Sequence, residues 1–147
     1  MNKYELRIIT ATGILMMSFL FSILYAAYSK KIDVPACIPY TASFKEPRVK
    51  QVDSTTFEVY AVARMWSFDP STIELPVGAT VDFYLTSNDV VHGFDIYKKG
   101  VNMMAVYGAV NKSTVKFDKP GVYKITCHEY CGAGHQNMQA EIIVNYK

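Results

Sequence analysis

The chain has 147 residues and half of them are apolar, so it can bury one hydrophobic core of ordinary size and has no room for a second large domain. Its formal net charge of +2 comes from the N-terminal region, because from Ile32 onward 11 Lys and Arg residues face 12 Asp and Glu residues. A head this close to neutrality offers no basic surface for nucleic acid, and we expect no nucleic-acid partner.

A long uncharged stretch near the N-terminus predicts a transmembrane helix. From Ile8 to Ser29, a run of 22 residues carries no charged side chain. A helix rises about 1.5 Å per residue, so this run covers roughly 33 Å and spans a hydrocarbon core of about 30 Å. The alternative is a cleaved secretory signal, which Ala26 and Ala27 would suit, but the apolar part of a signal is usually only about 7–15 residues long. We therefore assign residues 1–31 to a membrane anchor with its flanks and expect membrane lipid as a partner.

Residues 32–50 predict an extended tether between the anchor and a head domain. The segment holds three prolines and scattered charges without a hydrophobic period. Cys37 lies within it and is interpreted as a small linker residue without an assigned role. We expect the head to begin near Gln51 and to occupy residues 51–147.

The head carries the patterns of short β-strands. Alternating apolar residues at 56–63 and 81–85 predict two half-buried strands. Further short apolar runs, separated by turn signals, occur at residues 73–77, 90–96, 114–117, 122–126 and 140–144. No amphipathic helical period follows the anchor. These features predict an all-β head built as an antiparallel sandwich or barrel.

The twelve residues from Cys127 to Met138 hold two thiols, two imidazoles, a carboxylate and a thioether. Imidazole suits copper and zinc, thiolate suits copper(I) and zinc, and the thioether of Met138 shifts the choice toward copper. The loop joins a strand predicted to end at Thr126 to a strand predicted to start near Ala140, so the sheet holds both of its ends. The sequence therefore predicts a preorganised copper site.

The number of thiols in this loop bears on how many metal ions it holds. A mononuclear blue-copper site needs one Cys, two His and a weak axial Met, and the loop contains one thiol more than that. Two neighbouring thiolates can bridge two copper ions, with one imidazole on each. His92 is the natural second imidazole beside His135, because apolar neighbours flank it in the head.

Three simpler interpretations compete with a copper site. Cys127 and Cys131 could form a disulfide in an oxidising compartment, but His135 and Met138 would then have no role. A structural zinc site of two Cys and two His also fits the ligand count, with Met138 idle. Taken singly, His92 and Met138 could be ordinary core residues, as residues of these types more often are. Their combination at this spacing favours a metal.

At these residues the sequence resembles subunit II of the haem–copper cytochrome c oxidases, whose head carries the dinuclear CuA centre. The resemblance rests on Asp89-Val90-Val91-His92-Gly93-Phe94-Asp95-Ile96, on Pro120-Gly121-Val122-Tyr123 and on the whole loop from Cys127 to Met138. It implies a cupredoxin fold, which is a Greek-key β-sandwich and agrees with the strand pattern.

The resemblance also implies a ligand set. It assigns six metal-binding positions: Cys127 and Cys131 as bridging thiolates, His92 and Met138 on one copper, His135 and the backbone carbonyl of Glu129 on the other. In many family members the carboxylate at the Glu129 position binds a divalent ion such as Mg²⁺ where the head meets subunit I, although a solvated loop glutamate is the simpler interpretation.

Two features depart from the common family pattern. The common form of the subunit has two transmembrane helices before the head, whereas this chain has one and a short tether, similar to the compact variant of the b-type branch. The aromatic strip through which electrons enter commoner members is reduced, because Arg64-Met65-Trp66-Ser67-Phe68 keeps only Trp66 and Phe68. Trp66 is therefore the expected point at which electrons enter.

The resemblance implies that the chain is the electron-transfer subunit of a respiratory terminal oxidase. It would accept electrons from an external donor such as cytochrome c at the copper pair and pass them, with His135 as the exit residue, to haem in subunit I, where dioxygen is reduced. Basic residues flank both ends of the anchor and give no orientation. The chemistry of the donor sets it instead, with the head on the periplasmic or outer side of the cytoplasmic (inner) membrane and the N-terminus in the cytoplasm.

The donor-facing surface has two interpretations. Acidic residues such as Asp82, Asp89 and Asp95 could steer a basic cytochrome c toward the head. Because the head is close to neutral, an apolar docking face is equally compatible with the sequence.

The main alternative function is a membrane-tethered copper or zinc binding or carrier protein without a redox relay. Carriers need exposed, exchangeable ligands, whereas a loop held by two strands, with His92 in the interior, favours retention of the metal. Two relatives provide further alternatives: the copper domain of nitrous-oxide reductase carries a similar loop in a much longer chain, and quinol-oxidase subunit II lacks the copper ligands.

Overall fold

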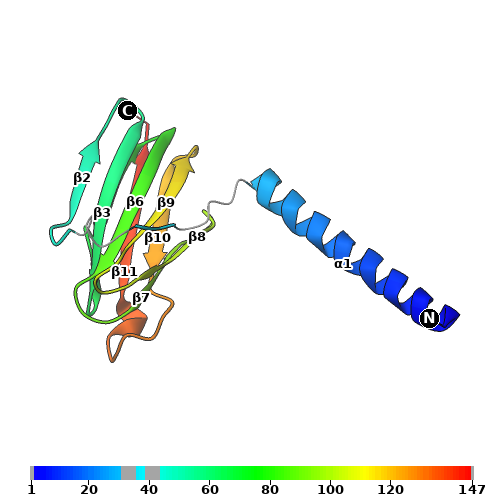
Figure 1. Cartoon of the computed structure of the whole chain (residues 1–147). Helices are drawn as coiled ribbons and strands as arrows, with labels where there is room; N and C mark the ends of the chain where they lie inside the picture. Colours follow the sequence, from blue (N-terminus) through cyan, green and yellow to red (C-terminus); the bar gives the residue numbers. More distant parts are fainter. Residues whose placement is uncertain (1, 31–35, 39–43, 147) are drawn as a thin grey trace. The chain divides into compact units, whose positions relative to one another are not determined.

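The computed structural model describes residues 2–30, 36–38 and 44–146 and separates the chain into an N-terminal helical unit and a β-rich unit. Helix α1 (Lys3–Lys30), blue in Figure 1, forms the first unit, and none of its residues is buried. The helix is long and apolar enough to cross a membrane. The hydroxyls of Thr10 and Ser22 donate to backbone carbonyls one turn earlier, at 2.7 and 2.8 Å, which satisfies them without water. Helix α1 is therefore a candidate membrane span, as the sequence predicts.

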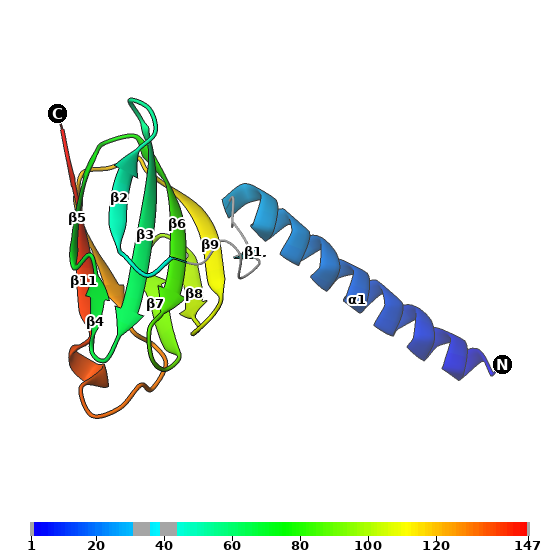
Figure 2. The same ribbon diagram turned by 60° about the vertical axis from the view of Figure 1, so that its left-hand side comes forward.

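The strands of the second unit form two sheets (Figures 1 and 2). The first sheet has the order β1-β9-β6-β3-β2, with β4 paired to β3, and consists of β1 (Ala36–Ile38), β2 (Arg48–Gln51), β3 (Thr56–Arg64), β4 (Ser67–Asp69), β6 (Ala79–Ser87) and β9 (Val110–Phe117). The second has the order β5-β11-β10-β7-β8 and consists of β5 (Thr72–Pro76), β7 (His92–Ile96), β8 (Val101–Ala105), β10 (Gly121–Thr126) and β11 (Gln139–Asn145). The predicted β-sandwich is confirmed, but two neighbouring pairs, β3 with β6 and β5 with β11, are parallel.

The core lies between the two sheets, and the predicted alternating patterns supply much of it. The inward-facing residues of β3 and β6 are Phe57, Val59, Ala61, Ala63, Val81, Phe83 and Leu85, all buried. Phe94 of β7 lies against Phe68 and Phe83 of the first sheet, with ring centroids 5.4 and 5.8 Å apart. Full burial of such a side chain contributes about 1.5–3 kcal/mol. These contacts hold β7 against the first sheet and so fix the position of His92 at its start.

Two strands lie within the segment that the sequence predicts as a tether. Strand β1 pairs with β9 and β2 pairs with β3, so the sheet begins before Gln51. All four residues of β2 are exposed, and an edge strand held by its backbone ladder needs no apolar alternation, which is why the pattern missed it. Residues 31–35 and 39–43 lie outside the described residues, while Cys37 lies in β1 opposite Asn111.

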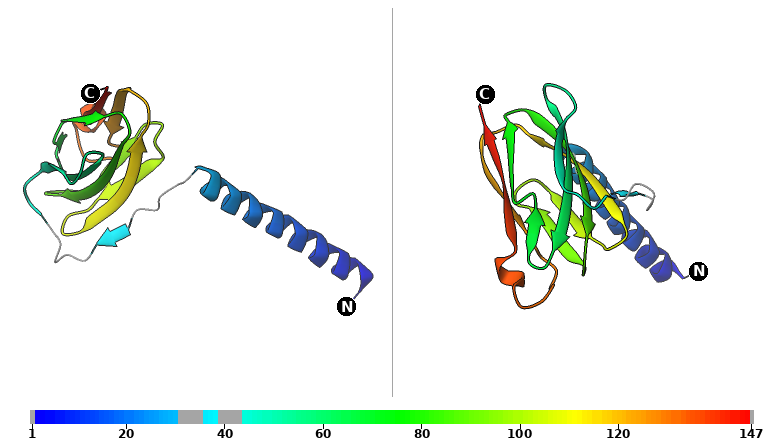
Figure 3. Two further views of the ribbon diagram at one scale, coloured as in Figure 1. Left: turned by 90° about the horizontal axis from the view of Figure 1, so that it is seen from above. Right: turned by 90° about the vertical axis from the view of Figure 1, so that its left-hand side faces the viewer.

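One end of the sandwich gathers the segments that carry the predicted site. The loop between β10 and β11, orange in Figures 1 and 3, lies at this end together with the start of β7. Figure 2 places β4 beside the same loop, and β4 follows directly after the segment with Trp66. Segments from both sheets therefore meet at this edge.

Candidate metal centre

The sheet holds both ends of the loop from Cys127 to Met138. Strands β10 and β11 pair up to the loop, and the N–H of Cys127 donates to the carbonyl of Met138 at 3.2 Å. Within the loop, the 3-10 turn η2 (His135–Asn137) begins where the N–H of His135 donates to the carbonyl of Gly132 at 3.1 Å. This turn brings the second half of the loop back toward the first.

The sulfur of Cys131 lies at the centre of the cluster. It is 3.7 Å from Sγ of Cys127, 3.6 Å from Nδ1 of His135 and 3.7 Å from Sδ of Met138. The sulfur of Cys127 lies 3.2 Å from the backbone carbonyl oxygen of Glu129. The structure therefore brings together the five ligand positions that the sequence places in this loop.

His92 joins the cluster from the start of β7. A ring nitrogen of His92 and the sulfurs of Cys127 and Cys131 lie within 4.8 Å of one another. Nε2 of His92 lies 2.7 Å from Oδ1 of Asp89, whereas Nδ1 is buried without a hydrogen-bond partner. A carboxylate only accepts hydrogen bonds, so Nε2 carries the proton and Nδ1 has a free lone pair.

The unpartnered nitrogen of His92 tests whether a metal fits here. A buried polar atom without a partner destabilises a fold by about 1–3 kcal/mol, and a cation bound to its lone pair removes that penalty. Two thiol sulfurs, a thioether, two imidazoles and a carbonyl oxygen surround one point, a soft donor set that suits copper better than a hard cation. The residues present therefore fit a copper centre.

Burial sets the protonation of the central thiol. The side chain of Cys131 is 5% exposed, and this burial, followed by the contact with the thiol of Cys127, raises the pKa of Cys131 to about 11. The thiol is protonated at neutral pH, so metal binding has to release its proton. Both cysteines are free thiols, with sulfurs 3.7 Å apart where a disulfide requires about 2.05 Å.

Asp89 is a site residue whose contact with His92 was not predicted from the sequence. Burial raises its pKa, but hydrogen bonds from His92 and from the backbone N–H groups of Met65 and Val90 outweigh burial, so the pKa of Asp89 lies below its ordinary value. A carboxylate three residues before a candidate ligand is a signal that the sequence does contain. From the sequence, Asp89 had a place only within a motif and as a steering charge.

Trp66 lies over the loop and keeps one edge in water. Its indole N–H donates to the backbone carbonyl of Cys131 at 3.1 Å, and the side chain is 43% exposed. A Cβ added to Gly134 would lie 2.4 Å from the indole ring, so the ring packs directly on the loop backbone. Phe68, the other aromatic residue retained in this segment, is buried in the core.

His128 is the one imidazole of the loop that the predicted ligand set omits. Its half-buried ring packs against the start of β7, because a Cβ added to Gly93 would lie 2.6 Å from three of its ring atoms. A residue larger than glycine would therefore displace this ring. His128 covers the backbone beside His92.

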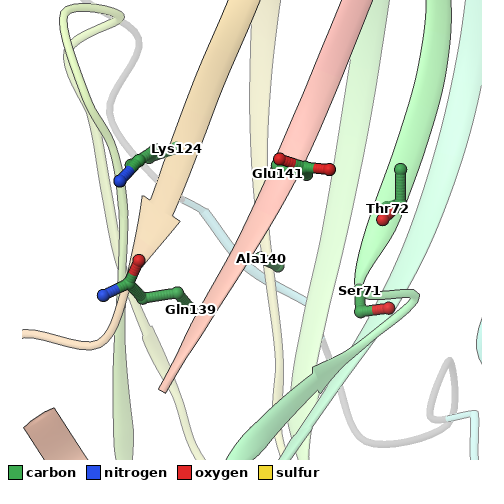
Figure 4. A pocket seen from close by; sticks show the side chains of 6 residues that line it. All are labelled: Ser71, Thr72, Lys124, Gln139, Ala140 and Glu141. Carbon is green, nitrogen blue, oxygen red and sulfur yellow. The ribbon is translucent and has the colours of Figure 1, made fainter. Parts of the chain in front are cut away.

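A shallow depression on the second sheet offers no comparable chemistry. It is lined by Ser71, Thr72, Lys124, Gln139, Ala140 and Glu141, from β5, β10, β11 and the residue before β5 (Figure 4). It contains neither thiol nor imidazole, so the soft donors of the described residues gather at the loop instead.

Comparisons with known proteins agree with this site and fold. Residues 48–146 match the family model described as cytochrome C oxidase subunit II, periplasmic domain. Cytochrome c oxidase subunit 2 of Thermus thermophilus is 40% identical over 96 residues, which cover 65% of this chain and 71% of the relative. For a second relative, from another strain record of the same species, the identity is again 40% and the covered share of the relative is 57%.

Solved structures extend the likeness to nearly the whole chain. A chain from a cryo-EM structure of a haem–copper terminal oxidase dimer superposes with a TM-score of 0.87 at 41% identity, covering 97% of this chain and 100% of that one. The periplasmic domain of subunit II of cytochrome oxidase from Bradyrhizobium japonicum gives a TM-score of 0.57 at 22% identity, over 61% of this chain and 84% of that domain. The latter likeness supports the fold alone, and the predicted cupredoxin-like sandwich is confirmed.

Proposed function

Because the chain belongs to the family of cytochrome c oxidase subunit II, we propose that it is the subunit at which electrons enter its oxidase. It is a subunit of a haem–copper terminal oxidase. In this proposal a dinuclear copper centre (CuA) supplies a one-electron carrier that receives electrons from an external donor, for which cytochrome c is our candidate, and delivers them to haem in subunit I. The observation that carries the proposal is the meeting of six donor groups around the sulfur atoms of Cys127 and Cys131.

The proposed ligand set follows the distances within the cluster. Cys127 and Cys131 are the bridging thiolates, since their sulfurs are adjacent and each lies beside further donors. The groups proposed for one copper are His92 and Met138, and those proposed for the other are His135 and the carbonyl of Glu129. Met138 and His92 are almost fully buried, which keeps water from competing for their positions.

The protein part of the proposed centre is rigid. The hydrogen bond from Cys127 to Met138 closes the loop at its base, and the aromatic core holds β7 in place beneath His92. Ligands held on strands keep their geometry when the charge of a bound metal changes, which favours fast electron transfer at small driving force. The same rigidity disfavours a metal carrier, whose ligands have to exchange.

Trp66 and His135 are the proposed points of electron input and output. The exposed edge of Trp66 reaches solvent while its indole N–H contacts the backbone of Cys131, so a donor docked there would be one hydrogen bond away from a bridging ligand. His135 is half-buried on the second half of the loop, with the exposed ring of Tyr130 5.9 Å away. A group in that position can face a partner subunit.

The proposed setting is the cytoplasmic (inner) membrane. Helix α1 would span the lipid once, with the N-terminus in the cytoplasm and the head on the periplasmic or outer side against subunit I. The side chain of Glu129 is exposed while its carbonyl faces Cys127, so the carboxylate is free to bind a divalent ion such as Mg²⁺ at the contact with subunit I.

One experiment tests the copper proposal directly. The full chain, purified in detergent and loaded with copper under controlled oxidation, should bind two copper ions per chain that share one unpaired electron in the EPR spectrum. Cys131→Ser is the matched control and should lose this signal. A colourless zinc protein, or a single blue copper in the wild-type chain, would contradict the proposal and favour the tethered metal-binding alternative.

A further inference from the structure

Asp89 uses both of its carboxylate oxygens, and each serves a different segment. Oδ1 lies 2.7 Å from Nε2 of His92 and also accepts the backbone N–H of Val90 at 2.7 Å. Oδ2 accepts the backbone N–H of Met65 at 2.7 Å, from the turn between β3 and β4. The hydroxyl of Ser87 lies 3.3 Å from Oδ1 and steadies the carboxylate from the end of β6. One side chain therefore joins the start of β7 to the segment that carries Trp66.

The contact with His92 decides which ring nitrogen faces the cluster. The imidazole is fully buried, and its Nδ1 has no partner among the described residues. With a carboxylate at Nε2, the proton sits on that nitrogen and the Nδ1 lone pair is left for a metal. A carboxylate in this position also increases the electron donation of the ring to a bound ion.

The contact with Met65 extends the connection to Trp66. Trp66 follows Met65 in the chain and donates its indole N–H to the carbonyl of Cys131 at 3.1 Å. Two hydrogen bonds thus fix the turn between β3 and β4, one to the residue behind His92 and one to the backbone of a loop cysteine. A change at Asp89 therefore reaches a candidate ligand and the exposed indole together.

We propose that Asp89 is a positioning residue for the metal centre, which holds His92 with Nδ1 toward the metal and anchors the turn bearing Trp66. The inference rests on the proposed copper site. It adds to that site a residue that touches no metal and acts through a ligand and through the electron-input segment.

The chain offers a matched control in Asp69. This aspartate forms an ion pair with Arg64 in the same β3–β4 hairpin. Neither partner has a described contact with the candidate ligands. Asp69→Asn therefore removes the same charge from the same hairpin and leaves the contact to His92 intact. It separates positioning from a general loss of negative charge near the donor surface.

The test compares Asp89→Asn, Asp69→Asn and the wild type as full chains in detergent. In the copper-free state, ¹⁵N NMR should find the proton of His92 on Nε2 in the wild type and in Asp69→Asn, with the Nδ1–H tautomer appearing in Asp89→Asn. In the loaded state, Asp89→Asn should bind copper about 10–100-fold more weakly, the range typical of lost outer hydrogen bonds to metal ligands. Its reduction potential should rise, because a less basic imidazole stabilises the oxidised ions less.

A second variant keeps the test informative if Asp89→Asn fails to fold. Ser87→Ala removes only the hydroxyl beside Oδ1 and leaves the carboxylate in place, so it should shift the potential in the same direction by a smaller amount. Wild-type values for the tautomer, affinity and potential in both Asp89→Asn and Ser87→Ala would overturn the positioning role. An equal shift in Asp69→Asn would overturn it as well, since charge alone would then explain the effect. If the wild-type chain binds no copper pair, the proposed function fails instead, whatever Asp89 does.

Discussion

The indole N–H of Trp66 donates to the backbone carbonyl of Cys131 at 3.1 Å, across sixty-five positions of sequence. The bond joins the hairpin of the first sheet to the loop of the second. It also gives an exposed aromatic ring a direct contact with the residue whose sulfur lies at the centre of the donor cluster. A change at Trp66 therefore acts on the loop as well as on the exposed surface.

Trp66→Phe should slow the bimolecular reduction of the copper-loaded chain by its donor while leaving the copper spectrum in place. Phenylalanine keeps an aromatic ring but lacks the N–H, so the contact with Cys131 is lost at about 0.5–1.5 kcal/mol of stability. Stopped-flow reduction and thermal unfolding measure the two effects. Tyr97→Phe, at an exposed aromatic residue beyond the far end of β7, is the control and should change neither. An unchanged reduction rate in Trp66→Phe would remove the electron-input role.

Gly134→Ala should destabilise the loop and displace the indole. The added Cβ would lie 2.4 Å from the ring of Trp66, and overpacking of this kind costs about 1–3 kcal/mol. Thermal unfolding and tryptophan fluorescence check the change, since Trp66 is the only tryptophan of the chain. Ala133→Ser, at the exposed neighbouring position, should leave both readouts unchanged.

Cys127→Ser and Cys131→Ser should each abolish the paired copper centre, whereas Met138→Leu should retain it. A bridging thiolate has no substitute in a hydroxyl, and the volume-conserving change at Met138 costs less than about 1.5 kcal/mol of folding energy. Copper content and EPR spectra distinguish the variants, with a shifted potential expected for Met138→Leu. A mixed-valence signal that survived in either serine variant would argue against bridging.

The copper-free chain under reducing conditions should lose stability at high pH through Cys131. The pKa of this thiol in the folded state is about 11, above its ordinary value of 9.0, because burial disfavours the thiolate. Its contribution is therefore complete below about pH 9 and declines as the pH rises through about 11. The difference in unfolding free energy between wild type and Cys131→Ser should shrink across this interval in denaturant titrations. A difference that stayed constant there would contradict the buried, protonated thiol.

The strands with apolar alternation could be predicted from sequence, and the polar edge strands could not. Phe57 and Val59 repeat with a period of two because one face of β3 is buried, and that period survives in the sequence. The residues of β2 are all exposed and pair through the backbone, so they carry no such period. The pattern of residues 32–50 accordingly predicts a tether although two strands lie in that segment.

The sequence by itself determined the chemistry of the candidate centre, because the loop from Cys127 to Met138 places most of the donors within one short stretch and the strands on either side hold its ends. The tertiary structure alone decided how Asp89, Met65 and Trp66 meet that loop. Their hydrogen bonds join segments that are far apart in the chain, and such contacts depend on how two sheets pack rather than on any local propensity or period. The identity of the donor groups was therefore local information, while their orientation came from the packing of the sandwich.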